Sequence, residues 1–346
     1  MRLITPVLLS LLSLTFASPP PRPPPRPPGH GHGKEKYPLV GYGLENPLGP
    51  TTGGADGPIV TVCTVEALQS AVAGTEPRTV LLDGSFELPE PLQVGSNKSL
   101  LGVGRSGGRI TKNGISILNG TNVILRNLYV GFIEGGDGLA IQGSTRVWVD
   151  HNEFESDMDH GPDYYDGQVD IVRASDWITV SWNYFHDHWK SSLVGNSDAL
   201  RDVDFGHLHI TYHHNHWKNS GTRGPAGRFG HQHIYNNLYT SFRYQAIHSR
   251  SDNQMLVEGN VFRGPNTGEA LSTYGLVVPA DSPNTSPDGD FEIDGFVNLG
   301  ARNDWGPATV NITQVGNFTE TGYRYELTPL WKVGREVERG AGLGRI

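Results

Sequence analysis

The stretch 178–185, ITVSWNYF, decides the fold, because its pattern recurs along the chain. Apolar and polar residues alternate from Ile178 to Ser181, which is typical of a β-strand with one buried face. The strand pattern runs into Asn183, then any residue, then an aromatic residue, here Phe185. The same triplet starts at Asn127, Asn152, Asn183, Asn215, Asn237 and Asn260, at intervals of 25, 31, 32, 22 and 23 residues.

Such intervals fit one coil of a solenoid and are too short, in most cases, for a βαβ unit with its own helix. Stacked coils would place each Asn above the next, so that the side-chain amides pair along a ladder while aromatic side chains stack inside. The repeat therefore predicts an all-β fold, a parallel β-helix. The segment from Val65 to Ala73 is predicted to form a helix that caps the open first coil.

The competing architecture is an antiparallel β-sandwich, which needs frequent two-residue hairpin turns. Those signals are sparse in this sequence, whereas its 45 glycines suit the many tight turns of a solenoid. The tail from about Gly300 carries no recognised repeat and is expected to pack along the outside of the coils.

Composition limits the possible functions. The 346 residues, 36% of them hydrophobic, can bury a large core in one long domain or two ordinary ones. The net charge of -9 argues against nucleic-acid binding, although a local basic cluster can still bind an anionic ligand. Cys63 is the sole cysteine, so no intramolecular disulfide can form.

The N-terminal segment predicts export. Arg2, the apolar run 3–14 and the small residue Ala17 predict a signal peptide over residues 1–18, and the apolar run is too short to span a bilayer. Residues 19–36 are rich in Pro, Gly and His and are expected to form a flexible leader before a folded domain at 37–346. We therefore expect a secreted, extracellular protein with no membrane partner. Five glycosylation sequons fit that expectation, at Asn97, Asn119, Asn284, Asn311 and Asn317.

Three widely spaced segments carry the chemistry: YYDGQVDI at 164–171, HDHWK at 186–190 and RGPAGR at 223–228. Asp166 and Asp170 are four residues apart, so on one strand they would project from the same side and share a divalent cation. The alternative is that both are ordinary turn or surface aspartates. Lys190, with the two arginines of the third segment, suits the binding of an acidic polymer.

From about Gly41 onward the chain resembles the pectate lyases, a family of polysaccharide lyases. The resemblance rests on long motifs in a fixed order, namely TTGGADGPIVTV at 51–62, VWVDHNEF at 147–154, YYDGQVDI, VSWNYFHDHWKSSLVG at 180–195, ITYHHN at 210–215, and RGPAGRFG followed by HIYNN ending at 237. It implies a right-handed, single-stranded parallel β-helix with peripheral loops. It also implies a carbon–oxygen lyase that cleaves α-1,4-linked polygalacturonate by calcium-dependent β-elimination, giving 4,5-unsaturated oligogalacturonides.

The resemblance also implies roles for individual residues. Asp137, Asp166 and Asp170 would bind Ca²⁺, Arg223 would abstract the C5 proton, and Lys190 and Arg228 would hold substrate carboxylates. On chemistry alone Lys190 is the easier base, because a guanidinium holds its proton more firmly than an ammonium, so the choice of Arg223 rests on the resemblance.

Three other functions remain open at this stage. A pectin lyase would act on methyl-esterified polymer and would lack the calcium acids; a hydrolase would need an acid and a base or nucleophile flanking the bond. A pectate-binding cell-wall protein would keep the scaffold without catalysis. A solenoid gives no reason to expect more than a monomer, and the histidines of the repeat, such as His151, His213 and His214, are interpreted as structural.

Overall fold

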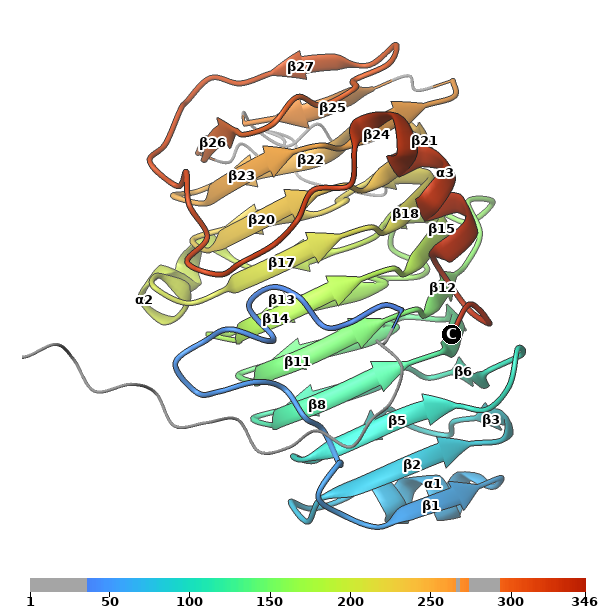
Figure 1. Ribbon diagram of the computed structural model, residues 1–346. Helices are drawn as coiled ribbons and strands as arrows, with labels where there is room; N and C mark the ends of the chain where they lie inside the picture. Colours follow the sequence, from blue (N-terminus) through green and yellow to red (C-terminus); the bar gives the residue numbers. More distant parts are fainter. Residues whose placement is uncertain (1–35, 266–267, 274–292) are drawn as a thin grey trace, which may run out of the picture. The chain divides into compact units, whose positions relative to one another are not determined.

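The computed structural model describes residues 36–265, 268–273 and 293–346. The expected signal peptide, almost all of the expected leader and the sequon at Asn284 lie outside these residues. Residues Leu39–Ile346 form one compact unit, which Figure 1 shows as a stack of coils.

Three parallel sheets build this unit, and each coil contributes one strand to each sheet in turn. The strands of the described residues form sheets of ten, eight and nine members. The first sheet contains β1 (Ile59–Val62), β2 (Arg78–Leu82), β5 (Lys98–Gly102), β8 (Thr121–Arg126), β11 (Thr145–Asp150), β14 (Asp176–Ser181), β17 (His209–His213), β20 (His231–Tyr235), β23 (Gln254–Glu258) and β26 (Phe296–Leu299). The second contains β3 (Gly84–Glu87), β6 (Gly108–Lys112), β9 (Leu128–Ile133), β12 (Glu153–Glu155), β15 (Tyr184–Lys190), β18 (His216–Thr222), β21 (Leu238–Phe242) and β24 (Val261–Arg263). The third contains β4 (Leu92–Gln93), β7 (Ile115–Leu118), β10 (Leu139–Gln142), β13 (Val169–Val172), β16 (Leu193–Val194), β19 (Ala226–Arg228), β22 (Gln245–Arg250), β25 (Glu269–Ser272) and β27 (Thr309–Asn311).

The strands of neighbouring coils pair in parallel, as β11 does with β8 and β14. This arrangement confirms the predicted right-handed parallel β-helix and excludes the antiparallel sandwich. The predicted cap is also present: α1 (Val65–Val72) begins after Thr64, whose hydroxyl accepts a hydrogen bond from the N–H of Ala67, and it packs against β1, β2 and β4 of the first coils.

The remaining helices are η1 (Asp198–Leu200), α2 (Arg201–Asp204) and α3 (Leu330–Gly340). Across the described ranges, no helix is long and apolar enough to cross a membrane.

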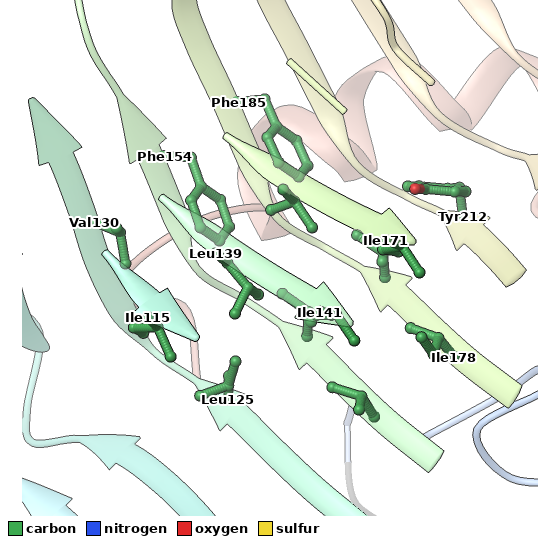
Figure 2. Packing of buried hydrophobic residues seen from close by; sticks show 14 of the residues in the cluster. Ile115, Leu125, Val130, Leu139, Ile141, Phe154, Ile171, Ile178, Phe185 and Tyr212 are labelled. Atoms are coloured by element: carbon green, nitrogen blue, oxygen red, sulfur yellow. The ribbon is translucent and has the colours of Figure 1, made fainter. Parts of the chain in front are cut away.

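The core runs through the middle of the coils (Figure 2). Leu139 and Ile141 of β10 lie in register with Ile115 and Ile117 below and with β13 above, so aliphatic side chains stack on like side chains. Each such fully buried side chain contributes about 1.5–3 kcal/mol relative to exposure.

The predicted asparagine ladder is present at the corner between the first and second sheets. The amide of Asn183 donates a 3.0 Å hydrogen bond to Oδ1 of Asn215, and Asn215 donates in the same way to Asn237. Inside the ladder, Phe185 stacks on Trp217 with ring centroids 4.0 Å apart. The ladder therefore satisfies buried amides and fixes the register of successive coils.

Two details of the predicted ladder are wrong. Asn127 is not a member of the ladder. In register it corresponds to His151 of the next coil, which is the residue before the ladder asparagine Asn152, and both Asn127 and His151 have a left-handed backbone, with φ of 58° and 51°. Asn303 is a member that the sequence analysis missed, because Asn260 donates to its Oδ1 at 3.1 Å. Trp305 follows at the aromatic position and contacts Phe262, so the repeat extends into the tail that was taken to lack it.

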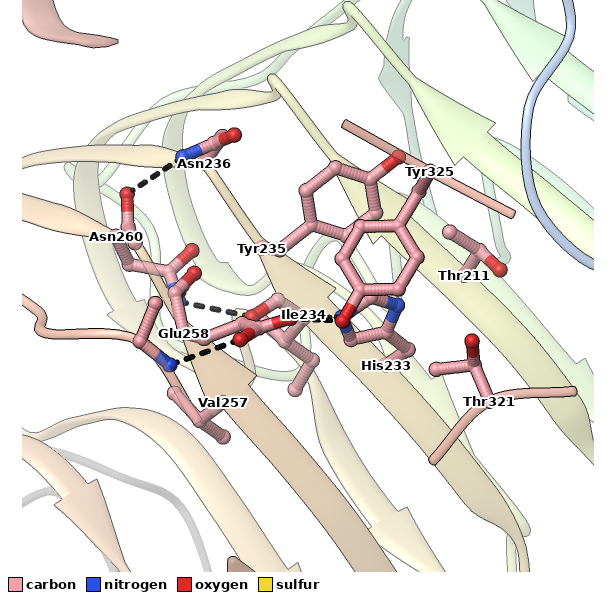
Figure 3. A network of polar contacts seen from close by, with 12 residues as sticks. Thr211, His233, Ile234, Tyr235, Asn236, Val257, Glu258, Asn260, Thr321 and Tyr325 are labelled. Carbon is pink, nitrogen blue, oxygen red and sulfur yellow. Dashed lines mark hydrogen bonds and ion pairs between the residues drawn. The ribbon is translucent and has the colours of Figure 1, made fainter. Parts of the chain in front are cut away.

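Beyond β27, the tail packs on the outside of the coils, as predicted, and Figure 3 shows Thr321 and Tyr325 of this segment beside His233 and Tyr235. Tyr325 donates a 2.5 Å hydrogen bond to Oε1 of Glu258, whose same oxygen lies 3.0 Å from Nε2 of His233. Burial opposes ionisation, but the hydrogen bonds from His233, Tyr325 and the N–H of Ala301 lower the pKa of Glu258 to about 2. Further on, α3 packs against β21 and β24.

Candidate active site

The predicted functional residues gather at the corner between the second and third sheets. In contrast to the ladder corner, its connections differ in length from coil to coil: 134–138, 156–168, 191–192 and 223–225. Asp137, Asp166 and Arg223 lie in these connections, and Lys190 is the last residue of β15 just before one of them. The β-helix thus brings together residues that lie up to 86 positions apart in the sequence.

Asp137 and Asp170 form the buried part of the site. The N–H of Gly167 donates to Oδ1 of Asp137 at 3.1 Å, and the N–H of Leu193 donates to Oδ1 of Asp170 at 3.0 Å. A Cβ on Gly167 would lie 2.4 Å from Oδ1 of Asp170, so only glycine leaves room for that carboxylate.

The two carboxyl groups oppose each other's ionisation. Burial, followed by the charge of Asp166, raises the pKa of Asp137 to about 6. Burial and the charge of Asp137 raise the pKa of Asp170 well above its usual range, against the lowering influence of Arg223. Without a bound cation, burial and the neighbouring carboxylates therefore disfavour ionisation of both groups.

Asp166 differs from its predicted placement. It lies in the connection 156–168 and not on a strand, so the argument that Asp166 and Asp170 project from one side of the same strand is wrong; only Asp170 belongs to β13. The exposed carboxylate of Asp166 lies 3.1 Å from Nζ of Lys190, which also contacts Asp163 at 2.7 Å.

Arg223 is placed by its backbone. Its carbonyl accepts a 2.7 Å hydrogen bond from the N–H of Ser192, and its φ of 64° is unusual for a side chain with a Cβ. The guanidinium acts electrostatically on both Asp137 and Asp170, so it lies over the acidic part of the site. Its Nε is buried and makes no hydrogen bond with any described residue.

Arg228 lies at the other end of β19 and is more deeply held than predicted. Its side chain is 9% exposed, its Nη1 donates to the carbonyl of Gly195 at 2.8 Å, and its Nε lies 3.5 Å from Asp198. Arg250 is buried beside it in register on β22.

Two residues of the site escaped the sequence analysis. Asp163 binds Lys190, and His188 is buried with its Nε2 2.6 Å from the carbonyl oxygen of Asp166. Burial lowers the pKa of His188 to about 4, so its imidazole is neutral and supports the Asp166 connection through a hydrogen bond. His188 stands inside the motif HDHWK, and Asp163 directly precedes the motif YYDGQVDI, but their partners depend on the register between coils.

The donor chemistry of the corner fits a hard cation. Ca²⁺ takes six to eight oxygen ligands, and the three carboxylates offer oxygen alone. In the described part of the chain, the carboxylate oxygens of Asp137, Asp166 and Asp170 do not all lie within 4.8 Å of one another. The three carboxylates would therefore supply only part of the coordination shell. Water and an anionic ligand would complete it.

Comparison with known proteins identifies the family. A family model described as pectate lyase matches residues 38–278. Pectate lyase A of Emericella nidulans is 38% identical over 304 residues, covering 87% of this chain and 86% of its own. Probable pectate lyase B of Aspergillus flavus is 43% identical over 225 residues, covering 64% and 68% of the two chains.

Solved structures give the same result. The pectate lyase Bsp165PelA from Bacillus sp. N165, in complex with trigalacturonate, is 30% identical with a TM-score of 0.75, over 88% of this chain and 99% of its own. Pectate lyase II from Xanthomonas campestris is 28% identical with a TM-score of 0.69, over 89% and 98%. Fold, site and relatives together define the class of the protein, a polysaccharide lyase built on a parallel β-helix. Within that class, the chain belongs to the pectate lyase family.

Proposed function

We propose that this enzyme cleaves de-esterified polygalacturonate by calcium-dependent β-elimination. The observation that carries the proposal is the convergence of Asp137, Asp166 and Asp170 with Lys190 and Arg223 at one corner of the coils. A uronate polymer is anionic, and it would meet cationic side chains and a cation held by the three carboxylates. When bound, Ca²⁺ would draw charge from the substrate carboxylate and favour the acidity of the neighbouring C–H bond.

In the reaction a base removes the proton from C5, and the C–H electron pair forms the C4–C5 double bond. The C4–O bond breaks, and the glycosidic oxygen leaves with its electron pair and takes a proton from solvent. We assign the base to Arg223, which would act as the neutral guanidine and become guanidinium on taking the C5 proton. Its buried Nε has no hydrogen-bond partner among the described residues, whereas Lys190 is engaged by Asp163 and Asp166.

Lys190 and Arg228 are assigned to substrate carboxylates. Lys190 suits this role because a substrate carboxylate can replace Asp163, which is largely exposed, as its partner. Arg228 reaches substrate only through the small exposed part of its side chain, and its bond to Gly195 orients it.

The test is the near-ultraviolet absorbance of polygalacturonate with purified enzyme, in Ca²⁺ and then in excess chelator. We expect a rise from the new double bond that stops on chelation. A rise that survives chelation, or that is faster on methyl-esterified polymer, would replace the proposal with pectin-lyase chemistry. Polymer cleavage without absorbance would indicate hydrolysis, and binding without cleavage would indicate a binding protein.

We further propose that residues 1–18 direct export, that residues 19–36 form a leader, and that the extracellular enzyme acts as a monomer. N-terminal sequencing and the mass of protein recovered from culture medium test the first two, and size-exclusion chromatography with light scattering tests the third.

A further inference from the structure

A second group of ligand-type side chains lies on the outer face of the second sheet. Strands β12 and β15 pair so that Glu155 lies opposite His186, while Phe154 and Phe185 between them stack into the core. Because strand residues alternate faces, Glu153 and Glu155 share the outer face with His186. In the part of the chain that the structure describes, this is the one group of three such side chains whose ligand atoms all lie within 4.8 Å of one another.

The free nitrogen of His186 points into this group. Its side chain is 9% exposed, its Nε2 is buried, and that atom makes no hydrogen bond with any described residue. Nε2 lies 3.5 Å from Oε1 of Glu153. Two ligands at about 2.0–2.1 Å from a tetrahedral zinc ion are about 3.3 Å apart, so this pair is already near the spacing that one ion requires.

The surroundings orient two of the three ligands, His186 and Glu155, as the outer partners of metal sites do. Nδ1 of His186 lies 2.7 Å from Oδ2 of Asp187, and Asn219 donates to the other oxygen of that carboxylate. A histidine that donates one ring N–H to a carboxylate presents its other nitrogen as a metal ligand. The hydroxyl of Tyr129 donates to Oε2 of Glu155 at 2.7 Å.

The competing interpretation is an ion pair between a protonated His186 and the acids around it. Burial opposes protonation of the ring, but Glu153 and Asp187, followed by the charge of Glu155, raise the pKa of His186 overall and so favour the ion pair. Nε2 nevertheless lies 3.5 Å from Oε1 of Glu153 in a geometry that makes no hydrogen bond, so a cation can take the place of that proton, and the zinc titration distinguishes the two. The other groups near the ring are Tyr184, which stacks on it with ring centroids 4.2 Å apart, and Glu155, Asp187, His216 and the exposed Lys218.

We propose that Glu153, Glu155 and His186 bind a first-row divalent cation, with Zn²⁺ as the matching ion, and that this ion ties β12 to β15. One imidazole and two carboxylates suit zinc, whereas Ca²⁺ takes oxygen ligands. The proposal is independent of the proposed calcium chemistry. The site lies beside the connection 156–168 and on the strand that ends at Lys190, so the ion would hold in place two elements of the active-site corner.

The experiment is a calorimetric titration of the full chain with Zn²⁺ in saturating Ca²⁺. A His30→Ala, His32→Ala background removes the histidines of the leader from the readout. We expect one equivalent of Zn²⁺ to bind, and expect binding at that equivalent to be lost in Glu153→Gln and in His186→Gln. Asp187→Asn keeps all three ligands and is expected to weaken binding roughly 10–100-fold. Glu87→Gln, on the same sheet, is the matched control and is expected to bind normally.

Two further readouts keep the test decisive. Co²⁺ in place of Zn²⁺ should give visible d–d absorption that disappears in His186→Gln, and unfolding temperatures in EDTA establish that each variant folds. Wild-type protein that binds no zinc, or a folded His186→Gln that binds it as tightly as wild type, would overturn the proposal.

Discussion

The two corners that flank the second sheet are built from the same coils but have different roles. The regular corner, between the first and second sheets, carries the asparagine ladder, and the irregular corner, between the second and third sheets, carries the candidate active site. At the first corner every coil from Asn152 to Asn260 uses the same device, a residue of left-handed backbone followed by a ladder asparagine. At the second corner the connections vary from two residues at 191–192 to thirteen at 156–168, and most of the proposed catalytic and metal-binding residues lie in or beside them. Repetition fixes the register, and the fixed register allows the irregular corner to place charges from distant segments side by side.

The largest expected effect comes from a substitution in the irregular corner that leaves the regular corner unchanged. Arg223→Ala should lower turnover roughly 10²–10⁴-fold, the usual contribution of a positioned base, while the unfolding temperature and pectate binding change little. Initial rates and a binding isotherm measure both. Arg339→Ala, on the exposed face of α3, is the control and should keep wild-type turnover. If Lys190→Ala abolished turnover with binding intact and Arg223→Lys did not, the two roles would be exchanged.

The matching change at the regular corner is Asn215→Ala. It removes an amide that accepts from Asn183 and donates to Asn237 and to the carbonyl of Val180, leaving buried partners unsatisfied. We expect a loss of about 3 kcal/mol or more in the free energy of unfolding, with normal activity per folded molecule. Denaturant unfolding measures it. Asn113→Ala, which loses one bond outside the ladder, should cost about 1 kcal/mol or less. Equal costs for the two variants would refute the ladder as the source of register.

A smaller effect, which depends on pH, concerns Glu258, to which Tyr325 of the tail donates a hydrogen bond. Because the folded-state pKa of Glu258 is lowered to about 2, its contribution to stability is present above pH ~4.5 and is lost as pH falls toward 2. His233, whose pKa is also lowered, mainly by burial, adds to the loss in acid. Glu258→Gln should therefore be about 1–2 kcal/mol less stable than wild type at pH 7, with the difference shrinking below pH ~4.5 and vanishing only near pH 2. A difference that stays constant across this range would show that Glu258 is not ionised in the fold.

The smallest expected effect comes from Asp163→Asn, which tests whether Asp163 competes with substrate for Lys190. Asp163→Asn removes a largely exposed ion-pair partner, so we expect a change in stability below about 1 kcal/mol. KM for polygalacturonate should fall modestly, because the ammonium is freed for substrate, and kcat should stay the same. Steady-state kinetics at two ionic strengths measure this, and a rise in KM would instead assign Asp163 to positioning Lys190.

The regular corner was largely predictable from the sequence, because its signal is local and repeated. The errors have physical causes. Asn127 imitates the motif because Asn also tolerates the left-handed backbone that the neighbouring position needs. Asn303 follows Asn260 by 43 residues, an interval outside the repeat.

At the irregular corner the sequence predicted which residue types matter but not their contacts. The pairing of Lys190 with Asp163 and Asp166, and the loop position of Asp166, follow from the lengths of the connections and the register between coils. Neither can be read from a motif taken alone. The Glu153, Glu155 and His186 group was missed for the same reason, since two coils must be in register before the three side chains meet.

The most direct test of the central claim is the calcium concentration that gives half-maximal absorbance rise in wild type and in Asp170→Asn. The account predicts that the variant needs at least about 10–100-fold more Ca²⁺ while folding normally in chelator, because the substitution removes a buried ligand whose charge is costly without a cation. A folded Asp170→Asn with the wild-type calcium requirement would contradict it and would remove the cation from this corner.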